Sequence, residues 1–211
     1  MSRGQFNTES LRDGCLQLGF EFTEDQLHHM LEHLRYMQVW NRKLNLTSID
    51  SAEDMITHHV LDSLALRSWT KGDRLLDMGT GGGFPGMPLA IANPNSRWTL
   101  LDSRNRRIEF LRFVCGQLQL DNAELVTARL ENYRPQAKFD TLVSRAFTSL
   151  AEMISLSRQL QHPGCRLLAM KGKHPQHEVS ELESGLQDRA RIEAVRVPNL
   201  DADRHVVIID F

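Results

Sequence analysis

The chain has 211 residues, of which 41% are hydrophobic and 25% charged, and its formal net charge is −2. This composition excludes a disordered chain, and the length suffices for one well-buried domain. Because the chain is not broadly basic, it would have to bind nucleic acid through a local patch. No apolar run approaches the ~18 residues of a membrane helix, and the first ten residues lack the apolar core of a signal peptide. We therefore expect a cytoplasmic protein with no membrane partner.

The cysteines and the clustered histidines indicate neither a disulfide framework nor a metal site. The three cysteines lie far apart and form no C-x-x-C pair: Cys15, Cys115 and Cys165. His174 and His177 lie three residues apart near Glu178, but no further ligand follows nearby. We expect reduced cysteines in the core and no bound metal.

Three segments within the first 70 residues place apolar side chains at the 3.6-residue spacing of amphipathic helices. Each follows a residue that favours a helix N-cap: Thr8, Thr23 and Ser51. Thr23 and Gln26 also form the pattern of a capping box, and a polar connector spans 41–47. Residues 1–70 are therefore predicted to form a helical cap that belongs to the same compact unit as the rest of the chain.

Beyond residue 70, short apolar runs alternate with helix-length segments. The predicted parallel strands are 74–78, 98–102, 123–127, 139–144 and 166–171. Such alternation is typical of βαβ units, which build a parallel sheet with helices on both faces. Two adjacent strand-like runs at 192–197 and 205–211 most simply form a hairpin. The sequence predicts an α/β domain over 71–211, with a doubly wound, mostly parallel sheet that includes an antiparallel C-terminal strand.

The stretch LLDMGTGGGFPGMPL, residues 75–89, places five glycines directly after the first predicted strand. In open α/β sheets the first βα turn lies close to the bound ligand, and glycine lets the backbone approach it. Gly81, Gly83 and Gly86 match the dinucleotide pattern G-x-G-x-x-G. In this register, however, Pro85 precedes the last glycine and the turn after the strand is overlong.

A second register begins at the end of the strand, with Asp77 two residues before the alternating glycines Gly79, Gly81 and Gly83. This is the opening motif of S-adenosylmethionine-dependent methyltransferases. Their cofactor carries an ammonium and a sulfonium, so a nearby carboxylate is favourable, whereas the same carboxylate would repel the phosphates of a dinucleotide. We expect these four residues to bind S-adenosylmethionine.

A second acidic residue also indicates a nucleoside cofactor. Asp102 ends the next predicted strand, roughly twenty residues after the turn, where a carboxylate can accept both hydroxyls of a ribose. NAD and S-adenosylmethionine share this ribose, so Asp102 does not choose between them. A nicotinamide-dependent oxidoreductase is the alternative enzyme, and a non-catalytic RNA- or nucleotide-binding module is the alternative without catalysis.

The residues after the fourth predicted strand limit the methyl acceptor. Residues 143–147 read VSRAF, where enzymes that methylate an exocyclic amino group carry an Asn/Asp-Pro-Pro-aromatic loop. Methylation of a pyrimidine carbon needs a cysteine nucleophile, but Cys115 falls inside a helix and Cys165 at the wrong end of its strand. Methylation of an atom with a free lone pair, such as guanine N7, needs neither that loop nor a cysteine nucleophile. Direct in-line displacement there depends on positioning and electrostatics alone.

A series of motifs runs through nearly the whole chain: NLTSI, HVLDS, DMGTGGGFPGMPLAI, LLDSRNRRIEFLR, SRAF, MKG and RHVVIID. Together they resemble the bacterial 16S ribosomal RNA guanine-N7 methyltransferases of the small subunit, a family formerly called glucose-inhibited division protein B. The resemblance implies a Rossmann-like class I methyltransferase fold with S-adenosylmethionine as donor. It also implies that the acceptor is a guanine in the decoding-region hairpin loop of 16S rRNA, within the 30S subunit or a precursor particle.

The resemblance also implies roles for single residues. Gly79 and Phe84 would contact the cofactor from the first turn, and Leu130 and Glu131 would bracket the adenine. Arg145 would lie beside the cofactor and is the candidate for positioning the substrate, with a salt bridge to a neighbouring acid as the alternative. No catalytic residue is identified.

Several basic residues are candidates for contact with RNA phosphates. Four of them cluster around the start of the helix after Asp102, two lie in the polar connector and one ends the fifth strand: Arg104, Arg106, Arg107, Arg112, Arg42, Lys43 and Lys171. Cations at a helix N-terminus oppose the helix dipole, which favours a functional reason for them, although a solvated charged surface is the alternative. Nothing in the sequence demands more than a monomer.

Overall fold

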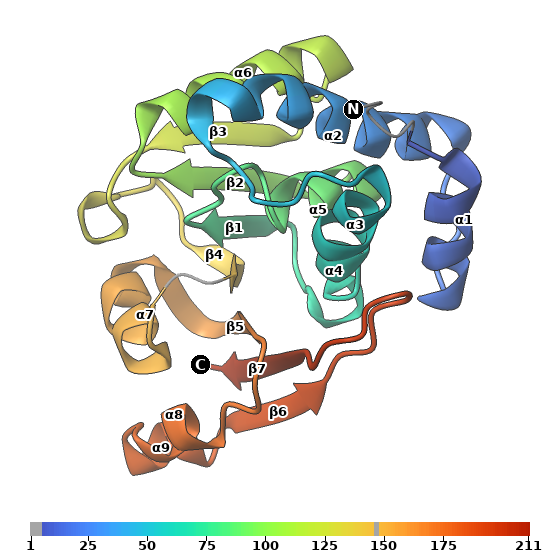
Figure 1. Cartoon of the computed structure of the whole chain (residues 1–211). Coiled ribbons are helices and arrows are strands. Elements are labelled where there is room, and N and C mark those ends of the chain that lie inside the picture. Colours follow the sequence, from blue (N-terminus) through green and yellow to red (C-terminus); the bar gives the residue numbers. More distant parts are fainter. Residues whose placement is uncertain (1–5, 146–147) are drawn as a thin grey trace.

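The computed structural model describes residues 6–145 and 148–211, and it begins with a set of helices (Figure 1). The helical segments before the sheet are α1 (Thr8–Gln17), α2 (Glu24–Leu44), α3 (Ala52–Met55), the π-helix η1 (Ile56–Leu61), α4 (Asp62–Leu64) and the 3₁₀-helix η2 (Arg67–Trp69). α3, η1 and α4 form one continuous helical stretch. Among the described residues, no helix is long and apolar enough to cross a membrane.

The helix starts follow the predicted capping chemistry, with one correction. Thr23 accepts from the Gln26 N–H and forms a complete capping box, and Ser51 Oγ accepts from the Asp54 N–H at 3.0 Å. Asn7, not Thr8, caps α1, because its Oδ1 accepts from the N–H of Glu9 at 2.9 Å. An asparagine is as good an N-cap as a threonine, so the prediction was wrong by one residue.

The polar connector begins later than predicted. α2 continues to Leu44, so Arg42 and Lys43 lie in its last turn, where cations complement the helix dipole. Asn45 then ends the helix in the left-handed conformation, at φ 49°, which asparagine tolerates better than most residues. The prediction of a connector over 41–47 was therefore wrong for its first four residues.

Within the described residues, seven strands form a single sheet in the order β3-β2-β1-β4-β5-β7-β6 (Figure 1). They are β1 (Arg74–Met78), β2 (Arg97–Asp102), β3 (Ala123–Thr127), β4 (Phe139–Arg145), β5 (Gln161–Lys171), β6 (Ala190–Ala194) and β7 (His205–Asp210). β1 to β5 pair in parallel, whereas β7 is antiparallel to both β5 and β6. The predicted fold class, including the C-terminal hairpin, is confirmed, although β6 ends three residues earlier than predicted.

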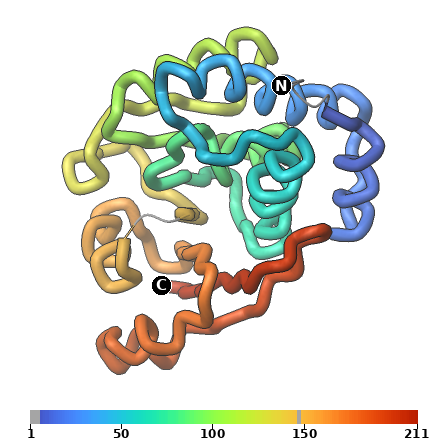
Figure 2. The backbone as a smooth tube through the Cα atoms, in the orientation of Figure 1, coloured from blue at the N-terminus to red at the C-terminus, as the bar shows by residue number. Residues whose placement is uncertain are grey.

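Alternate residues of the strands serve two separate apolar cores, one on each face of the sheet. Leu75 lies in the core that the N-terminal helices share with α5 (Gly86–Ala92) and α6 (Asn105–Leu118), whereas Leu76 lies in the opposite one. The second core is covered by α7 (Leu150–Ser157), α8 (Gln176–Ser180) and α9 (Ser184–Gln187) (Figure 1). Figure 2 shows the loop between β6 and β7 reaching toward α1.

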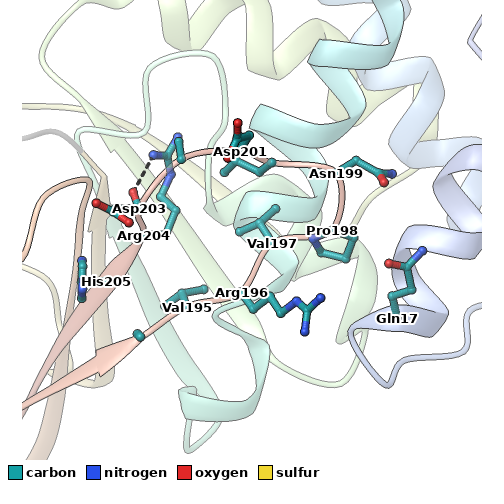
Figure 3. Close-up of a pocket in the computed structure, with 13 residues that line it drawn as sticks. Gln17, Val195, Arg196, Val197, Pro198, Asn199, Asp201, Asp203, Arg204 and His205 are labelled. Carbon is teal, nitrogen blue, oxygen red and sulfur yellow. Dashed lines mark hydrogen bonds between the residues drawn. The ribbon is translucent and has the colours of Figure 1, made fainter.

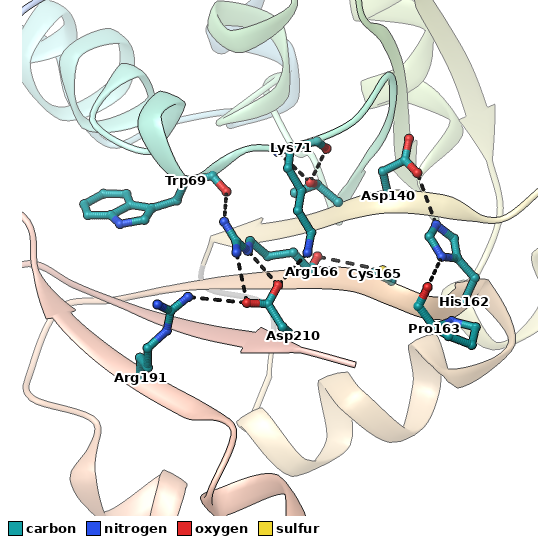
Figure 4. Close-up of polar contacts among 10 residues, drawn as sticks. Trp69, Lys71, Asp140, His162, Pro163, Cys165, Arg166, Arg191 and Asp210 are labelled. Atoms are coloured by element: carbon teal, nitrogen blue, oxygen red, sulfur yellow. Dashed lines mark hydrogen bonds and ion pairs between the residues drawn. The ribbon is translucent and has the colours of Figure 1, made fainter.

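An ion-pair network closes the amino edge of the sheet, where the parallel strands begin (Figure 4). Asp210 of β7 accepts from Arg166 of β5 through Nε and Nη2, each at 2.9 Å. Lys71 Nζ lies 2.7 Å from the same carboxylate, and Arg191 of β6 lies 3.3 Å from it. Arg166 and then Lys71 lower the pKa of Asp210 from its usual value to about 2. The network ties the C-terminal hairpin to the segment that precedes β1.

Candidate active site at the carboxyl edge of the sheet

The alternating glycines after β1 adopt backbone conformations that require glycine. Gly79, Gly81 and Gly83 have φ of 74°, 59° and 99°, in the region that side chains disfavour. The N–H groups of Gly79 and Thr80 donate to the Leu101 carbonyl at 2.8 and 2.9 Å, which fixes the turn to the end of β2. Gly79 and Gly81 remain partly exposed, so their backbone is the part of this turn that a ligand can approach.

Asp77 is completely buried beneath the same turn. Its Oδ2 accepts from Thr80 Oγ1 at 2.7 Å and from the Gly86 N–H at 2.8 Å, whereas Oδ1 has no partner among the described residues. Burial raises the pKa of Asp77 to about 6. A Cβ on Gly86 would lie 2.7 Å from Oδ2 and 2.3 Å from the Leu100 side chain, so this glycine serves packing rather than a dinucleotide.

Asp102 joins the second strand to the glycine turn. Its Oδ2 accepts from the Gly81 N–H at 3.0 Å and its Oδ1 from the Arg104 N–H at 2.8 Å. Arg107 Nη1 also lies 3.0 Å from Oδ2, and the Asp102 side chain is only 4% exposed. The glycine turn and Asp102, which are both predicted to bind the cofactor, are therefore in contact. A ribose bound by Asp102 would share the carboxylate with Arg107.

The two residues predicted to bracket the adenine lie in the 3₁₀-helix η3 (Leu130–Asn132), after β3. Leu130 is buried in the second core, and its carbonyl accepts from Gln159 Nε2 at 3.0 Å. Glu131 is exposed and lies 3.8 Å from Arg129. Both follow the carboxyl end of a parallel strand, on the same edge of the sheet as Asp102.

Phe84 is packed between two histidines that no prediction placed in the site. The residue is 4% exposed, and its ring stacks on His33 and His59 with 4.7 Å between centroids in each pair. His33 Nε2 lies 2.8 Å from the Gly82 carbonyl, which ties α2 to the turn. Burial lowers the pKa of His33 to about 4, and burial together with Arg145 lowers that of His59 to about 3. Both imidazoles are neutral at pH 7, and the predicted contact of Phe84 with cofactor stays a prediction.

Arg145 ends β4 and reaches back to the N-terminal helices. Its Nη1 donates to the His58 carbonyl at 2.8 Å and lies 3.3 Å from Asp62 Oδ2. Its guanidinium carbon lies 5.4 Å from the centre of the Phe84 ring. The salt bridge weighed as an alternative is therefore present, yet 24% of the side chain stays exposed. The last two residues of the SRAF motif, 146 and 147, lie outside the described residues.

The predicted RNA-binding residues differ in their surroundings. Those whose side chains are exposed are Arg42, Lys43, Arg104, Arg106 and Arg112. Arg107 pairs with Asp102, and Lys171 pairs with Glu178 at 2.7 Å. The last two side chains are thus held within the carboxyl edge rather than extended toward solvent.

Sequence reasoning did not single out Asp62 or Arg204, although both lie in the quoted motifs HVLDS and RHVVIID. Asp62 Oδ1 lies 3.0 Å from Arg204 Nε, so this buried carboxylate bridges Arg145 and Arg204. The three residues come from α4, β4 and the segment before β7. Only the motifs marked them, because no spacing in the sequence predicts that these segments meet.

Asp62, Arg145 and Arg204 border a pocket of about 690 Å³ between the helical cap and the sheet, which we call the cap–sheet pocket. Its lining residues are 45–49, His58, His59, Asp62, Arg145, Met153, 170–172 and Arg204. A second pocket, of about 970 Å³, is formed by Gln17 and residues 194–205 of the β6–β7 loop (Figure 3). No predicted cofactor residue is among those that line the second pocket.

The cysteine thiols are free and buried. Burial raises the pKa of the Cys115 and Cys165 thiols to about 11, so both are protonated at neutral pH and suited to packing rather than attack. Within 6–145 and 148–211, no group of three or more His, Cys, Asp or Glu side chains is arranged to hold a metal ion.

Comparison with known families matches residues 26–207 to the family model described as rRNA small subunit methyltransferase G. The chain belongs to this family. A ribosomal RNA small subunit methyltransferase G from Idiomarina loihiensis is 42% identical over 201 residues, which cover 95% of this chain and 97% of that protein. The resemblance inferred from the motifs is thereby confirmed, and the oxidoreductase and the non-catalytic module are excluded.

Solved structures of other methyltransferases share the fold of this member of the rRNA small subunit methyltransferase G family. A precorrin-6y C5,15-methyltransferase from Geobacter metallireducens has a TM-score of 0.52 at 16% identity, covering 81% of this chain and 91% of that chain. A coclaurine N-methyltransferase bound to N-methylheliamine and SAH has a TM-score of 0.50 at 18% identity. The match covers 79% of this chain and 57% of that chain. The predicted class I methyltransferase fold is confirmed.

The residues at the carboxyl edge fit the S-adenosylmethionine that this methyltransferase family uses. Within the part of the chain that the structure describes, Asp77 Oδ1 lacks a hydrogen-bond partner, as expected beside a ligand that brings an ammonium. Gly79 and Gly81 are partly exposed, and a Cβ on Gly81 would have no described neighbour closer than 3.9 Å, so a ligand can approach this backbone. The cofactor prediction is confirmed by the family, whereas the roles of single residues stay predictions.

Proposed function

We propose that this protein transfers the methyl group of S-adenosylmethionine to N7 of a guanine in the decoding-region hairpin loop of 16S rRNA. The observation that carries the proposal is the junction of the Asp77–Gly83 turn with Asp102 at the carboxyl edge of the sheet. This junction lies in a chain whose family is named for methylation of small-subunit ribosomal RNA. A bacterial ribosomal substrate would place the reaction in the cytoplasm.

Seven of the nine predicted cofactor-binding residues, all except Phe84 and Arg145, have a proposed part in holding the donor. Gly79, Gly81 and Gly83 keep the turn free of side chains, and Asp77 offsets the positive charge of the amino-acid portion. Asp102 accepts from the ribose hydroxyls, while Leu130 and Glu131 lie on either side of the adenine. Bound S-adenosylmethionine supplies a methyl group on a sulfonium, which makes sulfur a good leaving group.

The chemistry at N7 needs no base from the protein. The N7 lone pair forms the new N–CH₃ bond, and the electrons of the breaking S–CH₃ bond stay on sulfur, so no proton moves. His33 and His59, which are neutral at pH 7, suit such a step because neither adds a positive charge as the purine becomes cationic. The protein therefore contributes by alignment of donor and acceptor along one line.

RNA binding is proposed for the basic residues around α6 and at the end of α2. The exposed members are Arg42, Lys43, Arg104, Arg106 and Arg112, and they can meet phosphates without rearrangement. Because the net charge of the chain is −2, positive charge is confined to such a patch rather than spread over the surface. We propose that a monomer acts on the 30S subunit or a precursor particle, whose folded RNA completes the recognition surface.

Mapping of N7-methylguanine tests this function directly. Purified protein, labelled S-adenosylmethionine and unmethylated 30S subunits are incubated, and 16S rRNA is then cleaved chemically at N7-methylguanine. We expect one new cleavage site in the decoding-region hairpin loop. Label incorporated at another atom or in another RNA would contradict the proposal, and naked 16S rRNA methylated as fast as 30S would contradict the choice of particle.

A further inference from the structure

The cap–sheet pocket combines the two surfaces that a nucleotide needs. Leu46, Ile49, Met153 and Met170 supply apolar wall, and methionine sulfur contacts aromatic rings favourably. Arg145 and Arg204 supply cations on the same lining, where Lys171 is paired with Glu178. Its volume of about 690 Å³ lies within the usual range for small-molecule sites, about 300–1,000 Å³. An aromatic base with its phosphate is the chemical class that matches apolar walls beside guanidinium groups.

Asp62 fixes the orientation of the Arg145 and Arg204 side chains. Its side chain is 3% exposed and bridges Arg145 Nη1 at 3.3 Å and Arg204 Nε at 3.0 Å. The two arginine side chains remain 24% and 23% exposed. The carboxylate is thus shielded from a ligand while both guanidinium groups can meet one. A buried carboxylate with two guanidinium partners is costly to remove, because the arginines then lose their fixed geometry.

The pocket also shares a wall with the proposed cofactor turn. His59 and Arg145 line the pocket, and both contact the Phe84 ring that ends the glycine turn. Thr47 Oγ1 lies 2.9 Å from His59 Nε2 and holds this imidazole from the pocket side. A base seated in the pocket would therefore lie next to the turn that faces the methyl donor.

We propose that the cap–sheet pocket receives the acceptor guanine nucleotide, flipped out of its loop, and that Asp62 is a positioning residue for the pocket arginines. The proposal rests on the methyl transfer proposed above and names the place of its acceptor. Arg145, the arginine nearer the glycine turn, faces the base, and Arg204 faces the flanking phosphate. Extrusion is required because a base that stays stacked cannot reach a donor inside the protein.

Replacement of Asp62 tests the positioning role. In Asp62→Asn, we expect kcat on 30S subunits to fall about 100-fold, the loss typical of a misplaced reactant. The Kd for S-adenosylmethionine should stay within about twofold, because the bonds of the glycine turn to Asp102 are untouched. Asp210→Asn is the matched control, since it removes a carboxylate bound by arginines at the opposite edge of the sheet. This control should keep wild-type kcat.

An Asp62→Asn protein with kcat within threefold of wild type, or an equal loss in Asp210→Asn, would overturn the positioning role. Should Asp62→Asn fail to fold, Arg204→Met tests the same ion pair. Methionine removes the guanidinium group but keeps the apolar part of the side chain. We expect Arg204→Met to raise KM for 30S subunits about tenfold and to change kcat less than threefold, because its partner is the phosphate. An unchanged KM would overturn that assignment.

A direct binding experiment separates the pocket from the proposed activity. Guanosine 5′-monophosphate is titrated into the full chain with ¹³C-methyl-labelled methionine. We expect the methyl resonances of Met153 and Met170 to shift in the wild-type protein, and to shift far less in Arg204→Met. Shifts confined to other methionines would overturn the pocket, whatever the RNA assay shows. Shifts at these two methionines without methylation of any guanine N7 would support the pocket and contradict the proposed function.

Discussion

At the scale of single residues, the site is organised by two buried carboxylates with opposite surroundings. Asp77 lies under the glycine turn with a pKa raised to about 6, and one of its oxygens has no partner within 6–145 and 148–211. Asp62 lies between two guanidinium groups at the pocket wall. Among the residues that the structure describes, Asp77 has no cationic partner, whereas Asp62 has two. We therefore expect only the pKa of Asp77 to change strongly when a cationic ligand binds.

The raised pKa of Asp77 predicts a pH-dependent affinity for S-adenosylmethionine. The cationic ligand favours the ionised carboxylate, so affinity should be full above the pKa of about 6 and fall as pH drops through it. Between pH 7 and pH 5 we expect the Kd, measured by calorimetry, to rise about tenfold, one decade per pH unit below the pKa. In Asp77→Asn the Kd should be weaker and flat over this range. An equal pH dependence in that variant would contradict the role of Asp77.

Gly83 is predicted to tolerate no side chain. Its φ is 99°, and an added Cβ would lie 2.8 Å from Leu111 and 3.0 Å from the His33 ring. We expect Gly83→Ala to lower the free energy of unfolding by about 2–4 kcal/mol, from backbone strain together with crowding. Urea denaturation measures this loss. Gly116→Ala, in α6 with open space around it, should instead stabilise the protein by ~0.5–1 kcal/mol.

At the scale of elements, the helical stretch before the sheet brings distant residues to one site. The π-helical segment Ile56–Leu61 carries His59 against Phe84, and Asp62 follows it at once. π-helical turns occur frequently at functional sites, because they re-aim side chains that a regular helix would spread around its axis. The C-terminal hairpin plays a comparable part, since Arg204 precedes β7 and reaches the same carboxylate.

The amino-edge network predicts how the hairpin responds to acid. Because the pKa of Asp210 is lowered to about 2, its stabilising effect is complete above its unfolded pKa of about 3.9. The effect is lost as pH falls from about 4 through 2. We expect Asp210→Asn to lower Tm at pH 7 by about 2–4 °C, since solvent screening limits the loss to ~1 kcal/mol. Calorimetric scans should find this difference between variant and wild type vanishing toward pH 2; a difference that persists there would refute the linkage.

At the scale of the whole molecule, the helical cap and the sheet share one core. Leu34 and Met37 of α2 belong to the same buried cluster as Phe110 of α6. α2 also contacts the glycine turn, through the 2.8 Å contact of His33 with Gly82 and through Met37. We therefore propose that residues 1–70 are a structural part of the cofactor site rather than a separate domain.

Removal of the cap tests this proposal. A chain limited to residues 71–211 would expose the apolar faces of α5 and α6, which α2 covers. We expect this fragment to lose its near-ultraviolet circular dichroism, to bind a hydrophobic dye and to show no measurable affinity for S-adenosylmethionine. A fragment with native spectra and wild-type Kd would contradict the proposal and indicate an independent domain.

Much of the fold was predictable because local chemistry agrees with the tertiary structure. Thr23 and Ser51 mark helix starts, and the alternation of strands and helices predicts the doubly wound sheet. Two predicted boundaries, the start of α1 and the end of α2, were wrong because another residue nearby performs the same capping role. Asn7 outcompetes Thr8 as a cap, and Asn45 allows α2 to continue through the polar connector.

The amino-acid sequence by itself determined the fold class, the glycine turn and the family, because these depend on residues near one another in the chain. Only the tertiary structure decided which side chains meet: Arg107 with Asp102, Phe84 between two histidines, and Asp62 between Arg145 and Arg204. The last bridge joins residues separated by 83 and 142 positions. Such contacts follow from how the sheet aligns its carboxyl edge with the helical cap, and no periodicity within a segment encodes them.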